Sequence, residues 1–90
     1  MTVSRAQRRA AREPRAVALF GAHAAAALDL LELTELAWHD CFGEVSPSDE
    51  LIDDMLLLSD GTLDGLIAST RLAVTDWRDL KVAAAERRDS

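Results

Sequence analysis

The hydrophobic positions between residues 15 and 42 recur at helical spacing and predict a long helix that is apolar over more than half of its circumference. At about 100° per residue, one line along this helix carries only apolar side chains. That line consists of Phe20, Ala24, Ala27, Leu31, Trp38 and Phe42. Because each Å² of apolar surface left in water costs about 25 cal/mol, this helix needs more than one neighbour and should lie at the centre of the fold.

Two further helices are predicted, and each has its own start signal. The segment SPSD at residues 46–49 offers a capping serine, a proline at the first helical position and an acid, so a second helix is expected over 47–58. The segment SDGT at residues 59–62 is a tight turn that ends this helix and caps a third, expected over 63–87. The third helix carries the most regular amphipathic stripe, made of Leu63, Leu66, Ile67, Thr70, Ala73, Val74, Trp77, Leu80 and Ala84.

These elements predict an all-α fold, a three-helix bundle in which a long, a short and a second long helix form one domain over residues 14–90. Ninety residues allow one hydrophobic core at most, near the size at which oligomerisation commonly adds stability. β-Branched and aromatic residues never alternate over a useful length, so no sheet is expected. Pro14 is well placed in the first turn of the first helix, and Gly43 is a suitable residue to end it. Residues 1–13 are expected as a basic arm, flexible or helical.

The short second helix should leave parts of both long helices without a neighbour, which predicts a homodimer. At 1.5 Å per residue the second helix is about 18 Å long. Segments 17–27 and 77–85 should therefore project from opposite ends of the bundle, with apolar residues that a second copy would cover. The interface expected on this basis comprises Val17, Phe20, Ala24, Ala27, Trp38, Trp77 and Leu80.

The net charge of −6 conceals an asymmetric distribution of charge. Residues 1–16 carry five arginines and one glutamate, whereas residues 17–80 carry thirteen acids against two arginines. The acidic part repels nucleic acid and anionic membranes. Four arginines of the arm would lie on one face of a helix, and such a face attracts phosphates, although weakly and with a steep salt dependence. They are Arg5, Arg8, Arg9 and Arg12.

No arrangement of residues typical of an enzyme occurs in the sequence. A nucleophile with a partner, a pair of general bases and a phosphate-binding loop are all missing, so neither catalysis nor a cofactor is expected. Glu32, Glu35 and His39 share one helix edge, but a di-metal site needs Glu-x-x-His on two helices. We therefore expect no metal, and a solvated edge with an ion pair between Glu35 and His39. The acids within 49–54 and 60–64 lack the spacing of a calcium loop and should cap helices or lie in solvent.

The single cysteine and the distribution of apolar residues predict a cytoplasmic protein. Cys41 has no second cysteine to pair with and stands beside Phe42, so we expect a buried, reduced thiol. His23 is expected to be partly buried on an apolar flank. No run reaches the roughly 18 consecutive apolar residues of a membrane span, and the first thirty residues lack a signal-peptide pattern. Nine arginines against one lysine, with sixteen alanines, are typical of a high-GC bacterial genome.

The sequence favours a structural or protein–protein interaction module that is not an enzyme and acts as a homodimer or through another protein. The alternative is a nucleic-acid-associated regulator whose arginine arm contacts phosphates. The helices on either side of residues 59–62 have the outline of a helix-turn-helix, but a recognition helix should begin with basic residues. This one begins with Asp64 and has no base before Arg71.

Overall fold

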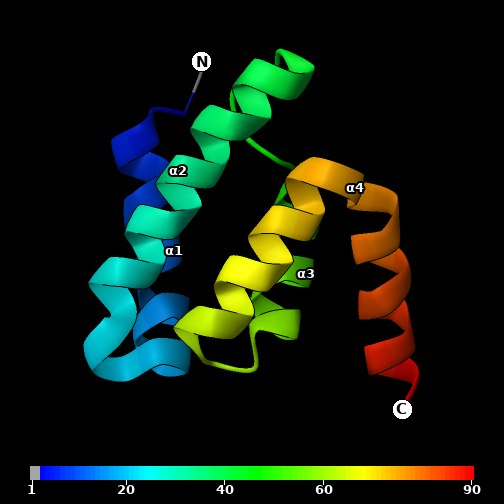
Figure 1. Ribbon diagram of the computed structural model, residues 1–90. Helices are drawn as coiled ribbons and strands as arrows, with labels where there is room; N and C mark the ends of the chain where they lie inside the picture. Colours follow the sequence, from blue (N-terminus) through cyan, green and yellow to red (C-terminus); the bar gives the residue numbers. More distant parts are fainter. Residues whose placement is uncertain (1–2) are drawn as a thin grey trace.

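The computed structural model describes residues 3–90, and their regular structure is entirely helical (Figure 1). The elements are α1 (Arg5–Phe20), a 3₁₀ turn η1 (Gly21–His23), α2 (Ala24–Phe42), α3 (Asp49–Ser59) and α4 (Leu63–Asp89). The all-α class is confirmed, as is the order of a long, a short and a second long helical stretch. The internal course of both long stretches differs from the prediction.

Helix α1 begins well inside the segment expected as a basic arm. Ser4 caps it in a capping box: the Ser4 hydroxyl accepts a hydrogen bond from the Gln7 amide at 3.1 Å, and the Gln7 side chain accepts one from the Ser4 amide at 2.8 Å. Pro14, expected to open the first long helix, lies inside α1 instead. The helical form of the arm is therefore the one present from residue 5 onward, and residues 1–2 lie outside the described residues.

The expected continuous helix over 15–42 is wrong, because the chain reverses direction at Gly21. This glycine has φ 54° and ψ −121°, a conformation that disfavours any residue with a Cβ. The turn η1 follows, and α2 then runs back beside α1 as the second arm of a hairpin (Figure 1). The apolar line predicted for one helix survives the break, because Phe20 on α1 and Ala24 and Ala27 on α2 all enter the same core.

The ends of the shorter connections largely follow the predicted signals. Gly43 ends α2 in the left-handed conformation, and its amide donates to the carbonyl oxygen of His39 at 2.8 Å. Thr62 caps α4 by accepting from the Gly65 amide at 3.0 Å. The start of α3 is two residues later than expected, because Ser48 is the capping residue and accepts from the Leu51 amide at 3.2 Å.

Helix α4 bends sharply at Asp76, which has φ −159° and ψ 83°. The Asp76 carboxylate accepts a hydrogen bond from the Asp79 amide at 3.2 Å, so this residue acts as a new N-cap within the helical stretch. The part before the bend lies beside α2, and the part after it runs back along α3 (Figure 1). The projecting ends expected at 17–27 and 77–85 are therefore not formed: one is the α1–α2 turn, and the other covers α3.

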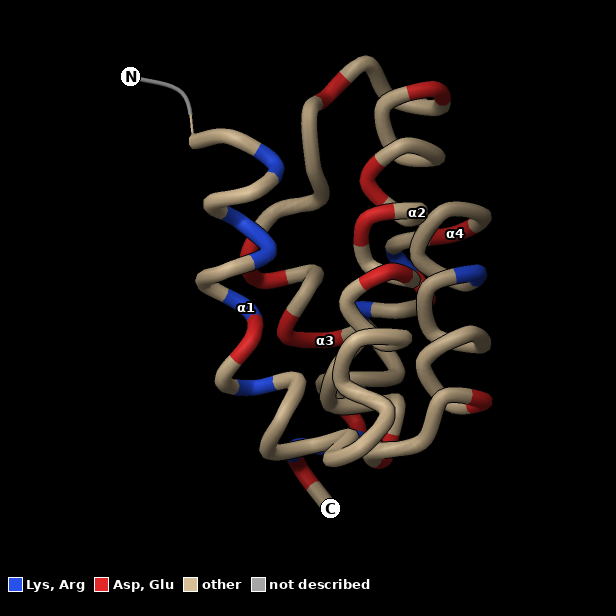
Figure 2. The backbone as a smooth tube through the Cα atoms, turned by 90° about the vertical axis from the view of Figure 1, so that its left-hand side faces the viewer, with Lys and Arg blue, Asp and Glu red and all other residues tan. Residues whose placement is uncertain are grey.

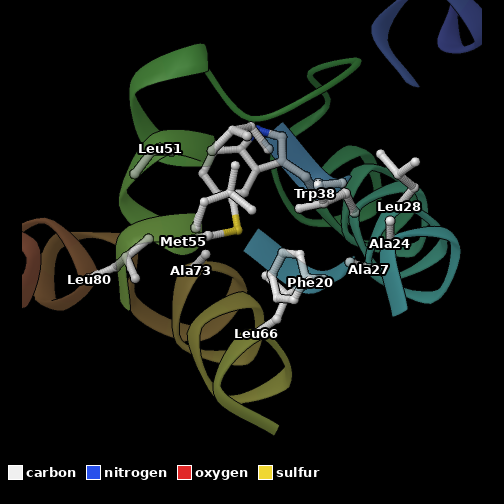
Figure 3. Close-up of a cluster of buried hydrophobic side chains, with 14 residues drawn as sticks. Phe20, Ala24, Ala27, Leu28, Trp38, Leu51, Met55, Leu66, Ala73 and Leu80 are labelled. Atoms are coloured by element: carbon white, nitrogen blue, oxygen red, sulfur yellow. The ribbon is translucent and has the colours of Figure 1, made fainter. Parts of the chain in front are cut away.

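The core draws side chains from all four helices (Figure 3). Five residues expected at a dimer interface are instead buried within the single chain, which corrects the predicted interface. These are Phe20, Ala24, Ala27, Trp38 and Leu80. Of the other two, Val17 is 54% exposed and Trp77 is half-buried. The physical reason is that each long stretch folds back on itself and supplies the neighbour it was expected to lack.

Candidate interaction surface

The basic positions of α1 lie on the side of this helix that faces acidic positions of α2 and α3 (Figure 2). The central contact is a buried ion-pair cluster around Glu35. The Glu35 side chain is 2% exposed. Arg8 donates to both carboxylate oxygens, from Nε at 2.6 Å and from Nη2 at 3.1 Å. Arg12 donates from Nη1 at 2.8 Å, and its Nη2 reaches the Ser46 hydroxyl at 3.2 Å. Two arginines one helical turn apart thus hold α1 against α2.

Burial and hydrogen bonding act on the pKa of Glu35 in opposite directions. Burial raises the pKa, but the hydrogen bonds from Arg8 and Arg12 outweigh it, so the net pKa lies below the ordinary value of 4.5. The same contact raises the pKa of the Arg8 guanidinium. Glu35 is therefore a charged group with neutralising partners inside the fold, which suits a structural role rather than proton transfer.

The other α1 arginines extend this pairing toward solvent. Arg9 contacts Asp29 at 2.8 Å and Glu32 at 3.3 Å, and Arg15 pairs with Asp53 of α3. Arg5 is exposed and has no ion pair within residues 3–90. The expected nucleic-acid face of four aligned arginines is consequently reduced, because three of the four guanidinium groups already contact carboxylates of the same chain.

The expected edge of Glu32, Glu35 and His39 does not form as predicted. Glu35 pairs with α1 rather than with His39, which is exposed. Within the described part of the chain, no group of three metal-ligating side chains comes together. Glu35 lies close to the apolar line that also contains Leu31 and Trp38, and this position was the available signal that it would be buried.

A second buried carboxylate, Asp54, joins the end of the chain to α3. Its side chain is 2% exposed and accepts from Arg88 at 2.8 Å, with the Lys81 ammonium at 3.8 Å. Lys81 also contacts Glu50, and their hydrogen bond lowers the pKa of the Glu50 carboxyl. The prediction that the acids of 49–54 are solvated is therefore wrong for Asp54, because the end of α4 folds over it.

Cys41 and His23 are both exposed, contrary to expectation. The cysteine lies in the last turn of α2, on the side away from the core, and its neighbour Phe42 is itself 42% exposed. His23 belongs to the η1 turn, where the chain reverses. Neither residue lies in the interior that the continuous helix would have provided.

The outer face of α2 and the first part of α4 form an apolar groove of about 320 Å³, here called the α2/α4 groove. Its lining is Leu30, Leu33, Thr34, Ala37, Ile67, Thr70, Arg71, Val74 and Thr75. Leu33 is 60% exposed and Ile67 is 41% exposed, and the nearby Leu36 is 46% exposed. Clustered large apolar side chains at a surface are a general feature of protein–protein and ligand-binding sites.

Arg71 lines this groove, and Asp64 lies on the same helix just before the groove begins. Asp64 and Arg71 are seven residues apart and therefore share a helix face, with Ile67 between them. At 1.5 Å per residue they are separated by about 10.5 Å along the axis, too far for an ion pair within one helix. Across residues 3–90, neither makes an ion pair. The exposed face of α4 thus carries Asp64, Ile67 and Arg71 in order, and the last two of these line the groove.

One stretch of the chain, Arg5–Phe42, is by length and composition alone long and apolar enough to cross a membrane. The same stretch contains the reversal at Gly21 and is therefore a helical hairpin rather than one straight helix. This hairpin includes α1, whose arginines form ion pairs, and the part of α2 that carries the apolar line.

No known protein family, curated protein or solved structure matches this chain.

Proposed function

We propose that the protein is a protein–protein interaction module. Its partner is a second copy of the same chain, which binds at the α2/α4 groove. One observation carries this proposal: exposed Leu33 and Ile67 line the groove, and the α4 face of Ile67 carries Asp64 and Arg71, which make no ion pair within the described chain. An apolar centre with opposite charges at its margins is the composition expected of a self-complementary interface.

The spacing along α4 supports an antiparallel, two-fold arrangement. Ile67 lies close to the midpoint between Asp64 and Arg71. A two-fold axis passing near Ile67 brings the two copies of this residue together and sets each Asp64 opposite the other copy's Arg71. Both charged pairs are then equivalent, as an isologous interface requires. Leu33 adjoins this contact from α2 and adds apolar surface that dimerisation covers.

The nucleic-acid alternative has less support, because Arg8, Arg9 and Arg12 are engaged by carboxylates. Removing residues 1–13 does not test it cleanly, since the deletion also removes both partners of buried Glu35. A charge reversal at exposed Arg5 is the cleaner test. If nucleic acid is the physiological partner, Arg5→Glu weakens binding and flattens its salt dependence while the fold is retained.

Analytical ultracentrifugation across the micromolar range tests self-association. The parent protein should sediment as a dimer, and Ile67→Glu should be a monomer because it places a carboxylate at the two-fold contact. Val82→Glu is the matched control: Val82 is 57% exposed and lies outside the groove, so this variant should remain dimeric. Far-ultraviolet circular dichroism establishes that each variant is folded. A folded parent that stays monomeric throughout this range would refute the proposal.

A charge swap tests the orientation of the two copies. Asp64→Arg and Arg71→Asp should each weaken dimerisation, because each creates like-charge contacts across the axis. The double variant should regain the affinity, since every intermolecular pair is restored with its signs exchanged. The spacing of the two residues prevents the rescue from arising within one helix. Additive losses in the double variant would rule out this arrangement.

A further inference from the structure

Three of the four aromatic residues of the chain line one cleft at the end of the bundle opposite the α1–α2 turn. This aromatic cleft has a volume of about 480 Å³ and is formed by Trp38 and Phe42 of α2, Trp77 just after the α4 bend, and the loop between α2 and α3. The remaining lining residues are Glu44, Ser46, Ser48 and Leu51. None of the cleft residues belongs to the α2/α4 groove.

Two of the three rings pack directly against one another, and the third comes from another helix. The ring centroids of Trp38 and Phe42 are 4.2 Å apart, with their planes at 43°. Trp38 is 4% exposed and forms the inner wall, whereas Phe42 is 42% exposed and forms the rim. Trp77 is half-buried and comes from a helix distant in sequence. The bend at Asp76 is what brings it to this place.

One carboxylate is held at the edge of these rings. The Trp38 indole Nε1 donates to Glu44 Oε1 at 3.1 Å, which positions the Glu44 side chain beside the aromatic wall. Within residues 3–90, Glu44 makes no ion pair with a lysine or arginine. Its negative charge is therefore available to a ligand, and it adds to the negative potential that the ring faces already carry.

The hydrogen-bonding groups of the cleft distinguish between kinds of cation. The Ser48 hydroxyl accepts from the Leu51 amide, and the Ser46 hydroxyl accepts from Arg12 and donates to the Pro47 carbonyl oxygen. Few acceptors remain for a primary ammonium, which has three N–H donors to satisfy. A quaternary ammonium has no N–H group and exposes an apolar methyl shell, so it suits aromatic walls with a single carboxylate.

A cation–π contact is already present within the chain at this cleft. The Arg78 guanidinium carbon lies 5.3 Å from the centroid of the Trp77 ring, within the range of a cation–π contact. We propose that the aromatic cleft is a binding site for a small quaternary ammonium ion, with Trp38, Phe42 and Trp77 surrounding its methyl groups and Glu44 balancing its charge. This site is independent of the proposed self-association.

Tryptophan fluorescence gives a direct readout, because both tryptophans of the chain line the cleft. Choline and tetramethylammonium should each cause a saturable change, measured against sodium chloride at equal ionic strength. The neutral isostere 3,3-dimethylbutan-1-ol has the shape of choline without its charge, and it should bind at least about tenfold more weakly. Equal binding of choline and this alcohol, or no saturable change with either cation, would overturn the proposal.

Phosphocholine and phosphatidylcholine vesicles identify the source of the ammonium group. The Glu44 carboxylate and the net charge of −6 disfavour the adjacent phosphate, so free choline should bind more tightly than phosphocholine. Tighter, saturable binding of the phosphate-bearing forms would still support a quaternary ammonium site. It would identify the ligand as a lipid headgroup rather than free choline.

Variants locate the site within the cleft. Phe42→Leu and Trp77→Leu should each weaken choline binding by roughly twofold to thirtyfold, and Glu44→Gln should weaken it without changing the fold. Leu36→Ala is the control, because Leu36 is exposed on α2 and lies outside the cleft. If all three cleft variants remain folded and bind choline as tightly as the parent, the assignment is wrong.

Discussion

Glu35 and Asp54 are both buried carboxylates that tie a terminal segment to the bundle, yet their cationic partners lie in different surroundings. The side chains of Arg8 and Arg12, which neutralise Glu35, are 15% and 11% exposed. Those of Arg88 and Lys81, which neutralise Asp54, are 50% and 35% exposed. An ion pair is difficult to lose when both partners are out of water, because the remaining charge has no solvent to replace its partner. The Glu35 cluster should therefore dominate the stability of the terminal contacts.

The largest expected effect is that of Glu35→Gln. This change leaves two largely buried guanidinium groups without their carboxylate, and it should lower the free energy of unfolding by about 3–5 kcal/mol. Urea denaturation followed by circular dichroism measures the loss. Asp54→Asn is the matched variant and should lower the free energy of unfolding clearly less, because the partly exposed Arg88 and Lys81 remain hydrated without the carboxylate. Equal losses would mean that the exposure of the cation does not decide the difference.

A smaller effect is expected when one arginine is removed from each cluster. Arg8→Ala should cost about 2 kcal/mol, because two charge-assisted hydrogen bonds to a buried carboxylate are lost. Arg88→Ala should cost at most about 1 kcal/mol, since this side chain is half exposed and Lys81 remains near Asp54. The comparison requires urea midpoints for both variants under the same conditions. A costlier Arg88→Ala would reverse the proposed ranking.

The Glu35 cluster should also produce an acid-dependent loss of stability. Because the folded pKa of Glu35 lies below its ordinary value of 4.5, its charged form is stabilised in the fold. Its contribution is present above pH 4.5 and is lost as the pH falls through the lower, folded pKa. Urea midpoints measured between neutral pH and acid should fall more steeply for the parent than for Glu35→Gln. Parallel pH profiles would assign the acid loss to other carboxylates.

The smallest effect is expected for Glu50→Gln. Glu50 pairs with Lys81 at the surface, and its side chain is 73% exposed, so water and salt already weaken the contact. The variant should unfold at the same urea concentration as the parent within experimental error, at both low and high salt. A distinct, salt-sensitive shift would show that the Lys81 pairs contribute more than their exposure indicates.

The missed features of the fold had local signals that the apolar periodicity concealed. Ser4 and Gln7 have the spacing of a capping box, and Asp76 is a good N-cap residue. Gly21 stands directly between Phe20 and the alanine-rich segment that follows, where a glycine permits a reversal of the chain. Periodicity reports which side chains are apolar but not the direction of the chain, so a stripe that crosses a reversal looks continuous. The apolar periodicity therefore predicts helix interior at both reversals.

The candidate sites were less accessible to prediction than the helices. The sequence predicts Trp38 and Trp77 at a dimer interface, whereas their meeting in the aromatic cleft depends on the bend at Asp76. The groove between α2 and α4 likewise exists only because the hairpin turns the outer face of α2 away from the core. Arg8 and Glu35 are 27 positions apart, and no pattern within a helix relates them.

The sequence alone determined the all-α class and the helix ends at Gly43 and Thr62, because helix propensity, capping and periodicity act between residues within a few positions of one another. Only the tertiary structure decided that the arginines of α1 neutralise Glu35, that Phe20 and Leu80 enter one core, and which apolar residues remain outside. Those outcomes depend on where the two long stretches reverse, and a reversal changes the neighbours of every residue beyond it.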